Sequence, residues 1–346
     1  MFEISQLIRR VIDVLQEAIF ENYGIVMGRQ EATGTYLRFF SNNTLYTIIP
    51  VQEVDETELM ERLKLSVFMH TQGDFYVSKF ILTRNNTYLA EDADQLFILL
   101  ENSVLEQARP SQMGYKLAKF HNRGKSFNEP ITACSRIGKW KELWEGRIDY
   151  IETLWKNKVQ THPANEFEKL FVESFPYYLG LAENAIQYLV DSEIDDDPSE
   201  IDTGTVCHER FYTTSWIGKY LVKNPFDWVF DHHSRDLGEW VREHQRLFPT
   251  TYQPEMVDFL REYNYYSPIS GFSWKLIYAR LLFPVHYIEI IERYFEDKKV
   301  DRQKEAEDKL VSFLQKSHHY EEFLRYFFTV NEIPIARLGI SKVDWL

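Results

Sequence analysis

The stretch of sequence that decides the fold runs from residue 206 to residue 240. Its two informative segments are VCHERF at residues 206–211 and PFDWVFDHHSRDLGEW at residues 225–240. Histidines, arginines, acids and tryptophans are concentrated here, and residues 201–232 form an irregular, strand-poor stretch. Polar side chains on irregular segments between regular elements are typical of binding and catalytic sites. The chemistry of this chain is therefore expected in this region.

Helical patterns surround this region on both sides. From Pro110 onward, apolar residues recur at three- and four-residue spacing, which indicates amphipathic helices. The expected helices cover residues 111–124, 136–158, 164–191, 235–247, 253–264, 273–297, 301–316 and 318–330. The later two thirds of the chain are therefore predicted to be mainly helical.

Two β-hairpins are predicted in the first hundred residues. Thr35–Phe40 and Leu45–Val51 are rich in β-branched and aromatic residues, and Ser41–Asn43 forms the turn between them. Residues 75–83 and 86–100 predict a second pair of strands, which turns at a pair of asparagines. Both hairpins are expected in one small antiparallel sheet.

Two further helices, at residues 3–22 and 55–72, alternate with the hairpins. A sheet-rich part followed by a helical part is the pattern of an α+β protein. We therefore predict two lobes. The small lobe, residues 1–105, contains the antiparallel sheet, and the large helical lobe covers residues 106–346.

The composition argues against several classes of protein. The 346 residues carry a formal net charge of −14, so binding to a nucleic-acid backbone is not expected. The most apolar stretch, Ala279–Ile291, is short and is interrupted by a proline and polar residues, so membrane insertion is not expected. Cys134 and Cys207 lie far apart and are expected to be reduced thiols of a protein made in a cytoplasm.

Several motifs resemble those of a known superfamily. KLAKFH at residues 116–121, the loop at His208 and RDL at residues 235–237 are similar to motifs of aminoglycoside phosphotransferases and choline-kinase-like proteins. Within this superfamily the chain most resembles the spore-coat kinase-like proteins of endospore-forming bacteria, the CotS and YutH group, and YutH-like proteins above all. The segments around Tyr263 and after Pro284 are also similar, so the resemblance spans nearly the whole chain.

The resemblance implies a two-lobed protein-kinase-like fold. It also implies a location in the bacterial spore coat after synthesis in the mother-cell cytoplasm. Other spore coat proteins are then the expected partners. The sequence predicts neither the ligand nor the oligomeric state.

The catalytic loop of the superfamily has the pattern H-G-D-x-x-x-x-N, and this chain departs from it at three positions. His208 matches the histidine. Glu209 stands in place of the glycine, Arg210 in place of the catalytic aspartate and Ser215 in place of the metal-binding asparagine. Because arginine does not deprotonate in proteins, Arg210 cannot accept a proton from a substrate hydroxyl. We therefore expect no catalytic residue here, a structural role for His208 and an ion pair for Arg210.

Other parts of a kinase site are missing or ambiguous. Phosphoryl transfer needs a strand lysine, a helix acid that positions this lysine, and an aspartate that holds magnesium. The lysine is expected near Ile48–Pro50, where no residue is charged, and Glu58 or Glu61 is the expected helix acid. The metal-binding aspartate would be Asp227 or Asp231, and the sequence does not decide between these weak candidates.

Three hypotheses follow for the function. The leading one is a spore coat-associated pseudokinase with a structural or binding role, for which neither a metal nor a cofactor is expected. The alternative is a small-molecule phosphotransferase, similar to aminoglycoside or choline kinases, with a rearranged site that uses Glu209 and Asp227 or Asp231. ATP and magnesium are expected only for this enzyme. The third is a nucleotide- or sugar-binding regulator without chemistry.

Overall fold

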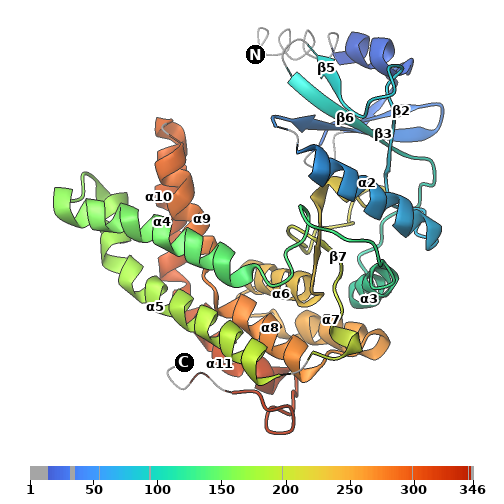
Figure 1. Cartoon of the computed structure of the whole chain (residues 1–346). Helices are drawn as coiled ribbons and strands as arrows, with labels where there is room; N and C mark the ends of the chain where they lie inside the picture. Colours follow the sequence, from blue (N-terminus) through green and yellow to red (C-terminus); the bar gives the residue numbers. More distant parts are fainter. Residues whose placement is uncertain are drawn as a thin grey trace. The chain divides into compact units, whose positions relative to one another are not determined.

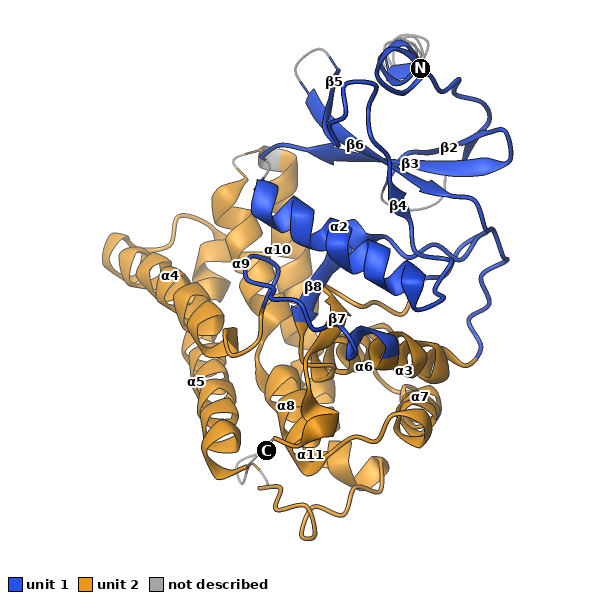
Figure 2. Ribbon diagram, turned by 45° about the vertical axis from the view of Figure 1, so that its right-hand side comes forward, with its two compact units in different colours: residues 1–111, 123–135, 214–230 blue, residues 112–122, 136–213, 231–346 orange. Residues whose placement is uncertain are grey.

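The structure is a computed structural model that describes residues 15–31, 36–53, 55–92, 95–196, 198–297, 299–341 and 343. The chain divides into two compact units, coloured separately in Figure 2. Unit 1 comprises residues 1–111, 123–135 and 214–230, and unit 2 comprises residues 112–122, 136–213 and 231–346. These units are defined by packing. The division into a lobe at 1–105 and a lobe at 106–346 stays a prediction.

Unit 1 is built on an antiparallel sheet (Figure 1). The strand order is β1-β2-β3-β6-β4, and β5 also pairs with β6. The strands are β1 Gln30–Glu31, β2 Arg38–Ser41, β3 Thr44–Val51, β4 Lys79–Phe80, β5 Ala90–Asp92 and β6 Gln95–Asn102. Together with the helices described below, this sheet confirms the predicted α+β class.

The first predicted hairpin is confirmed as β2 and β3. Ser41 pairs with Thr44, which leaves Asn42 and Asn43 as the two turn residues. Their φ angles are 46° and 65°. Asparagine tolerates this left-handed conformation better than most residues, and two such residues form the turn that suits a two-residue hairpin.

The second predicted hairpin is confirmed only in part. Its two segments pair through β4 and β6, where Phe80 lies opposite Leu100, but residues 86–100 are split into β5 and β6, and β4 pairs with β6 rather than with the strand that follows it. A turn is present where it was expected, since the Asn86 amide donates to the Thr83 carbonyl. However, the Thr83 and Thr87 side chains hydrogen-bond across this turn and close a local loop. The strand ladder therefore does not continue from it.

Two helices belong to unit 1. Residues 15–23 are helical, and residues 3–14 of the expected helix 3–22 lie outside the described part of the chain. Helix α2, Glu56–Thr71, begins at Asp55, whose carboxylate accepts hydrogen bonds from the Thr57 and Glu58 amides and caps the helix. Leu59 of α2 packs with buried residues of β3 and β6, which fixes the helix against the sheet.

Unit 2 is helical (Figure 1). The helices are α3 Met113–Gly124, whose last two residues fall in unit 1, α4 Trp140–Thr161, α5 Glu166–Asp195, α6 Ser234–Leu247, α7 Gln253–Tyr266, α8 Gly271–Leu282, α9 Val285–Glu296, α10 Val300–Gln315 and α11 Ser317–Val330. The expected single helix 273–297 is wrong, because the chain leaves the helical conformation at Phe283, directly before Pro284. A residue before proline is disfavoured in the helical region.

The region 201–232 contains only short elements. They are the 3-10 helix η1 Glu200–Asp202, strand β7 Thr205–His208, the 3-10 helix η2 Pro225–Asp227 and strand β8 Trp228–Asp231. Within the described residues, no helix combines the length and the apolar character needed to cross a membrane.

Helix α6 is polar in sequence and yet buried. Its residues from Ser234 to Gln245 are all buried, including two arginines and three acids. A buried charge is tolerated only when it is paired and hydrogen-bonded. The partners of these α6 charges therefore determine what this part of unit 2 can do.

Candidate functional site

The expected site residues are divided between the two units. His208, Glu209 and Arg210 lie at the end of β7 and just after it in unit 2, together with Asp231 at the end of β8. Ser215 belongs to unit 1, and so does the other candidate metal ligand, in η2. Each group is described within its own unit.

Asp236 on α6 holds the loop that begins at His208. One of its carboxylate oxygens accepts a hydrogen bond from the His208 amide at 2.9 Å, and the other lies 2.7 Å from His208 Nδ1 and 3.2 Å from His121 Nε2. Burial alone would raise the pKa of Asp236, but the two histidines lower it below its ordinary value. Asp236 is therefore an ionised anchor, and His208 serves the structure of the loop.

A potential metal-ligand set lies beside this anchor. Single donor atoms of His121, Cys207 and Asp236 are all within 4.8 Å of one another. Each already has a protein partner, since His121 Nδ1 lies 2.8 Å from the Tyr263 hydroxyl and the Cys207 thiol contacts the Asp231 carbonyl. Burial also raises the pKa of Cys207, which disfavours the thiolate that metals bind. Hydrogen bonding alone accounts for the arrangement.

Arg210 is held between two acids. Its Nη1 donates to Glu239 Oε2 at 2.7 Å, and its Nη2 forms an ion pair with Glu289. Burial alone would lower the pKa of Arg210, but the two carboxylates raise it above its ordinary value. Arg210 is thus a fixed cation in the loop after β7.

Glu239 is the centre of a buried charge network. It accepts hydrogen bonds from Arg242 at 2.9 Å and from Arg280 at 2.5 Å, in addition to the bond from Arg210. These three arginines lower the pKa of Glu239 well below its ordinary value, although burial alone would raise it. The Arg280 guanidinium also lies 4.5 Å above the ring of Trp140, so the network extends to α4.

Both oxygens of Asp231 are occupied by protein donors. Trp140 Nε1 donates to Oδ2 at 2.8 Å, Arg235 Nε donates to the same atom at 2.6 Å, and the His232 amide donates to Oδ1 at 2.8 Å. The residue is 1% exposed. Magnesium prefers free carboxylate oxygens and water in its coordination shell. In this arrangement Asp231 supplies a structural ion pair.

Glu209 is the exposed acid of the loop. Its side chain is 56% exposed and lies 3.8 Å from Arg235 and 3.9 Å from Arg136. Its carbonyl accepts a hydrogen bond from Arg235 at 3.0 Å. Glu209 is thus a solvent-facing partner of two arginines.

Two of the expected site residues lie in unit 1. Ser215 is half-buried in a turn, directly before Trp216, whose φ angle is 60°. Asp227 accepts hydrogen bonds from the Tyr36 hydroxyl at 3.0 Å and from Asn224 Nδ2 at 3.1 Å. Asp227 therefore fixes η2 within unit 1.

Of the two expected helix acids of unit 1, Glu58 pairs with Arg62 at 2.6 Å and Glu61 anchors a loop. Glu61 is buried on α2 and accepts hydrogen bonds from the Thr132 amide, the Thr132 hydroxyl and the Cys134 amide, at 2.8, 2.9 and 2.8 Å. Burial alone would raise the pKa of Glu61, but these hydrogen bonds lower it. Of the three residues near which a lysine was expected, Ile48 and Ile49 are buried in the apolar core of this unit and Pro50 is exposed.

No sequence pattern indicated the buried lysine of unit 1, Lys223. Lys223 Nζ and Arg123 Nη1 each lie 2.7 Å from the same oxygen of Asp74. The lysine also lies 4.3 Å above the ring of Trp216. Asp74 is 149 residues from this lysine, so no local motif could have predicted the pair.

Solved structures with the same architecture are small-molecule kinases. An aminoglycoside phosphotransferase from Alicyclobacillus acidocaldarius matches with a TM-score of 0.65 and 14% identity, over 92% of this chain and 96% of that one. A microcompartment-associated aminopropanol kinase matches with a TM-score of 0.61 and 12% identity, over 92% and 98%. At this identity the likeness concerns the fold, and it confirms the predicted kinase-like class.

The family is shown by sequence. The model of the family described as "Spore coat putative kinase YutH" matches residues 16–327. The endospore coat-associated protein YutH of Bacillus subtilis (strain 168) is 39% identical over 334 residues, which cover 96% of this chain and 98% of that protein. The chain belongs to this family of spore coat kinase-like proteins.

Proposed function

We propose that this chain is a spore coat-associated protein that has kept the kinase-like fold and does not transfer phosphate. It acts through binding or structural contacts with other spore coat proteins. The observation that carries the proposal is the position of Arg210 between Glu239 and Glu289. In the resembled enzymes the corresponding position is occupied by a base, whereas in this chain it is occupied by a cation held by two carboxylates.

The chemistry of the surrounding groups supports the same proposal. A general base must accept a proton in the transition state, and an arginine whose pKa is raised by two acids cannot do so. The buried candidate for the metal aspartate, Asp231, is engaged by Trp140 and Arg235. Of the two candidate helix acids, Glu61 binds backbone amides and Glu58 pairs with Arg62. These contacts support the proposal that the chain lacks a working base, metal ligand and lysine.

The proposed location comes from the family. The 39% identical relative is named as endospore coat-associated, and we extend this location to the present chain. Synthesis would take place in the mother-cell cytoplasm, with assembly on the coat afterwards. A fluorescent fusion expressed from the native promoter in sporulating cells tests this: signal is expected at the forespore surface. A fusion that stays diffuse through spore maturation contradicts the proposal.

A thermal-shift measurement with ATP and magnesium tests whether the protein binds a nucleotide. A ligand that binds the folded state raises its stability according to concentration and affinity. We expect no increase in Tm with ATP and magnesium, compared with magnesium alone. A saturable increase would instead support the hypothesis of a nucleotide-binding regulator.

A further inference from the structure

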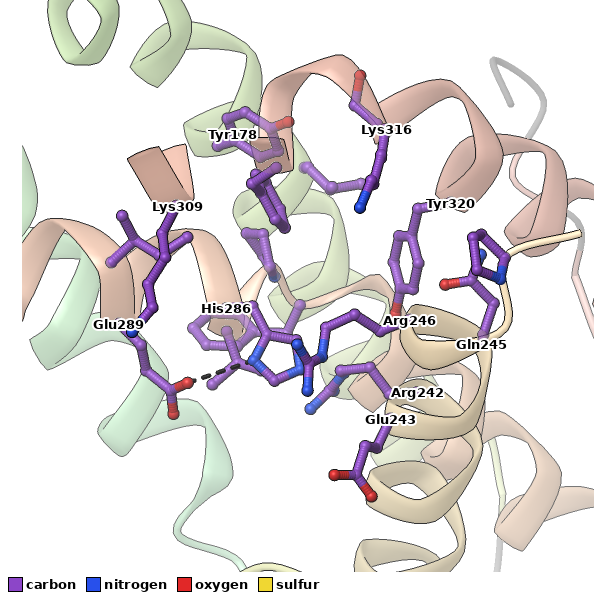
Figure 3. Close-up of a pocket in the computed structure, with 18 of the residues that line it drawn as sticks. Tyr178, Arg242, Glu243, Gln245, Arg246, His286, Glu289, Lys309, Lys316 and Tyr320 are labelled. Atoms are coloured by element: carbon purple, nitrogen blue, oxygen red, sulfur yellow. Dashed lines mark hydrogen bonds and ion pairs between the residues drawn. The ribbon is translucent and has the colours of Figure 1, made fainter. Parts of the chain in front are cut away.

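Unit 2 contains a pocket of about 470 Å³ beside the Arg210 ion pairs (Figure 3). Its walls come from α5, α6, α9, α10 and α11, and from the junction between α8 and α9. Pockets for small molecules typically have volumes of about 300–1,000 Å³. The pocket is therefore large enough to hold a small ligand.

Aromatic side chains form much of its wall. Tyr178 of α5 and Phe283 of the α8–α9 junction are buried, and Phe313 of α10 lies 5.6 Å from Tyr178 between ring centroids. Aromatic rings offer apolar contact together with stacking and edge contacts. A ligand with an apolar or aromatic body would bury its surface here.

The acids of the pocket are already satisfied by protein donors. Glu289 pairs with Arg210 and His286, Glu321 accepts from the Tyr177 hydroxyl at 2.8 Å, and Glu243 accepts from the Thr213 amide. Of these acids, only Glu289 forms an ion pair with an arginine, whereas Glu243 and Glu321 accept hydrogen bonds from neutral donors and keep their negative charge.

Several positively charged residues of the pocket have no acidic partner within the described part of the chain. Arg246, Arg293 and Lys316 line it and form no ion pair with the residues that the structure describes. Arg242 is buried in the wall, and its Nε has no hydrogen-bond acceptor among the described residues. Figure 3 shows Arg242, Arg246 and Lys316 around one space, with Lys316 approaching from the side of α11. Arg246, Arg293 and Lys316 outnumber the two lining acids that lack a described cationic partner, Glu243 and Glu321, so the pocket has an excess of positive charge, opposite in sign to the chain's net charge of −14.

We propose that this pocket binds a small anion whose carboxylate or phosphate is attached to an aromatic or apolar body. The arginines and the lysine bind the anionic group through charge-assisted hydrogen bonds, and the aromatic wall contacts the body. This inference goes beyond the proposed function. It holds whether or not the chain transfers phosphate.

Matched probe molecules test the charge preference. Isothermal titration calorimetry at low ionic strength, without nucleotide, would compare benzoate, phenyl phosphate, benzylamine and inorganic phosphate. Benzoate and phenyl phosphate are expected to bind at least about tenfold more tightly than benzylamine, because charge-assisted hydrogen bonds contribute about 1.5–3 kcal/mol, which is more than a factor of ten. Inorganic phosphate is expected to bind more weakly than phenyl phosphate, since it lacks the ring.

Charge-reversed variants then locate the site. The double variant Arg246→Glu/Lys316→Glu changes two exposed pocket residues and is expected to weaken phenyl phosphate binding at least about tenfold. The control, Lys304→Glu/Arg325→Glu, makes the same charge change at exposed positions outside the pocket on α10 and α11 and should change affinity less than about threefold. Far-UV circular dichroism confirms that both variants are folded. No anion binding by the unmodified protein, equal binding of benzylamine, or equal losses in both variants would overturn the proposal.

Discussion

The Nη1 atom of Arg210 lies 2.7 Å from the Oε2 atom of Glu239, an acid that is only 3% exposed at the centre of α6. The pair joins the loop after β7 to a helix that is buried along most of its length. Arg210 thus contributes to the packing of unit 2 by joining this loop to α6.

Removing the charge of Glu239 is expected to be strongly destabilising. In Glu239→Gln the guanidinium groups of Arg242 and Arg280 stay buried without their carboxylate partner, and breaking a buried ion pair in this way typically costs about 3–5 kcal/mol. Urea denaturation measures the free energy of unfolding. The control is Glu322→Gln, at an exposed acid on α11, which should change it by less than about 0.5 kcal/mol. Equal stability of the two variants would show that the network around Glu239 is unimportant.

Restoring the family's motif is not expected to restore chemistry. Arg210→Asp combined with Ser215→Asn recreates the loop pattern, but it places a third carboxylate beside Glu239 and Glu289. We expect a loss of stability on the order of 3 kcal/mol and no phosphate transfer, since none of the residues near which a lysine is expected, Ile48 to Pro50, is charged. Activity assays and denaturation of the double variant test both. Measurable turnover by this variant would mean that the loop alone limits activity.

Acid should weaken unit 2 in a defined pH range. Burial alone would raise the pKa of Glu289, but the hydrogen bond to His286 and the Arg210 charge lower it from 4.5 to about 2. The unfolded chain then binds more protons than the folded protein, so stability present above pH 4.5 is lost as the pH falls toward 2. Denaturation at pH 6, 5, 4 and 3 should give a steeper loss for the unmodified protein than for Glu289→Gln. If the free energy of unfolding falls equally with pH in both proteins, the lowered pKa of Glu289 is contradicted.

Replacing either of two acids on α2, one turn apart, should lower the free energy of unfolding by clearly different amounts. Glu61→Gln disturbs three hydrogen bonds to Thr132 and Cys134 and should cost about 1–3 kcal/mol. Glu58→Gln removes a partly exposed pair with Arg62 and should cost about 0.3–0.5 kcal/mol. Urea denaturation of both variants gives the comparison. If Glu61→Gln lowers the free energy of unfolding less than Glu58→Gln does, Glu61 does not anchor this loop.

Local signals in the sequence predicted much of the fold. The β2–β3 hairpin follows from strand-forming residues around Asn42 and Asn43, which adopt the turn conformation. The α2 boundary follows from the cap at Asp55. The pairing of β4 with β6 joins segments that are not adjacent in the sequence, and periodicity within each strand does not specify a distant partner.

The candidate site was predictable only in part. The replacement of a base by Arg210 is visible in the sequence, and an ion pair was expected for it. Its partners, Glu239 and Glu289, are 29 and 79 residues away and had to be found from the structure. The same holds for Asp231, whose role depends on Trp140, 91 residues earlier. Long-range pairs of this kind depend on helix packing, which the sequence does not specify residue by residue.

A phosphate-transfer assay tests the central claim most directly. Purified protein is incubated with γ-labelled ATP, magnesium and a panel of sugars, amino alcohols and aminoglycosides, with a known small-molecule kinase as positive control. We expect no transfer above background to any acceptor, because loss of a general base alone typically lowers the rate by about 10²–10⁴-fold and the other parts are also changed. Robust transfer by the unmodified protein, abolished by Glu209→Ala or Asp227→Ala, would contradict the account and identify a phosphotransferase with a rearranged site.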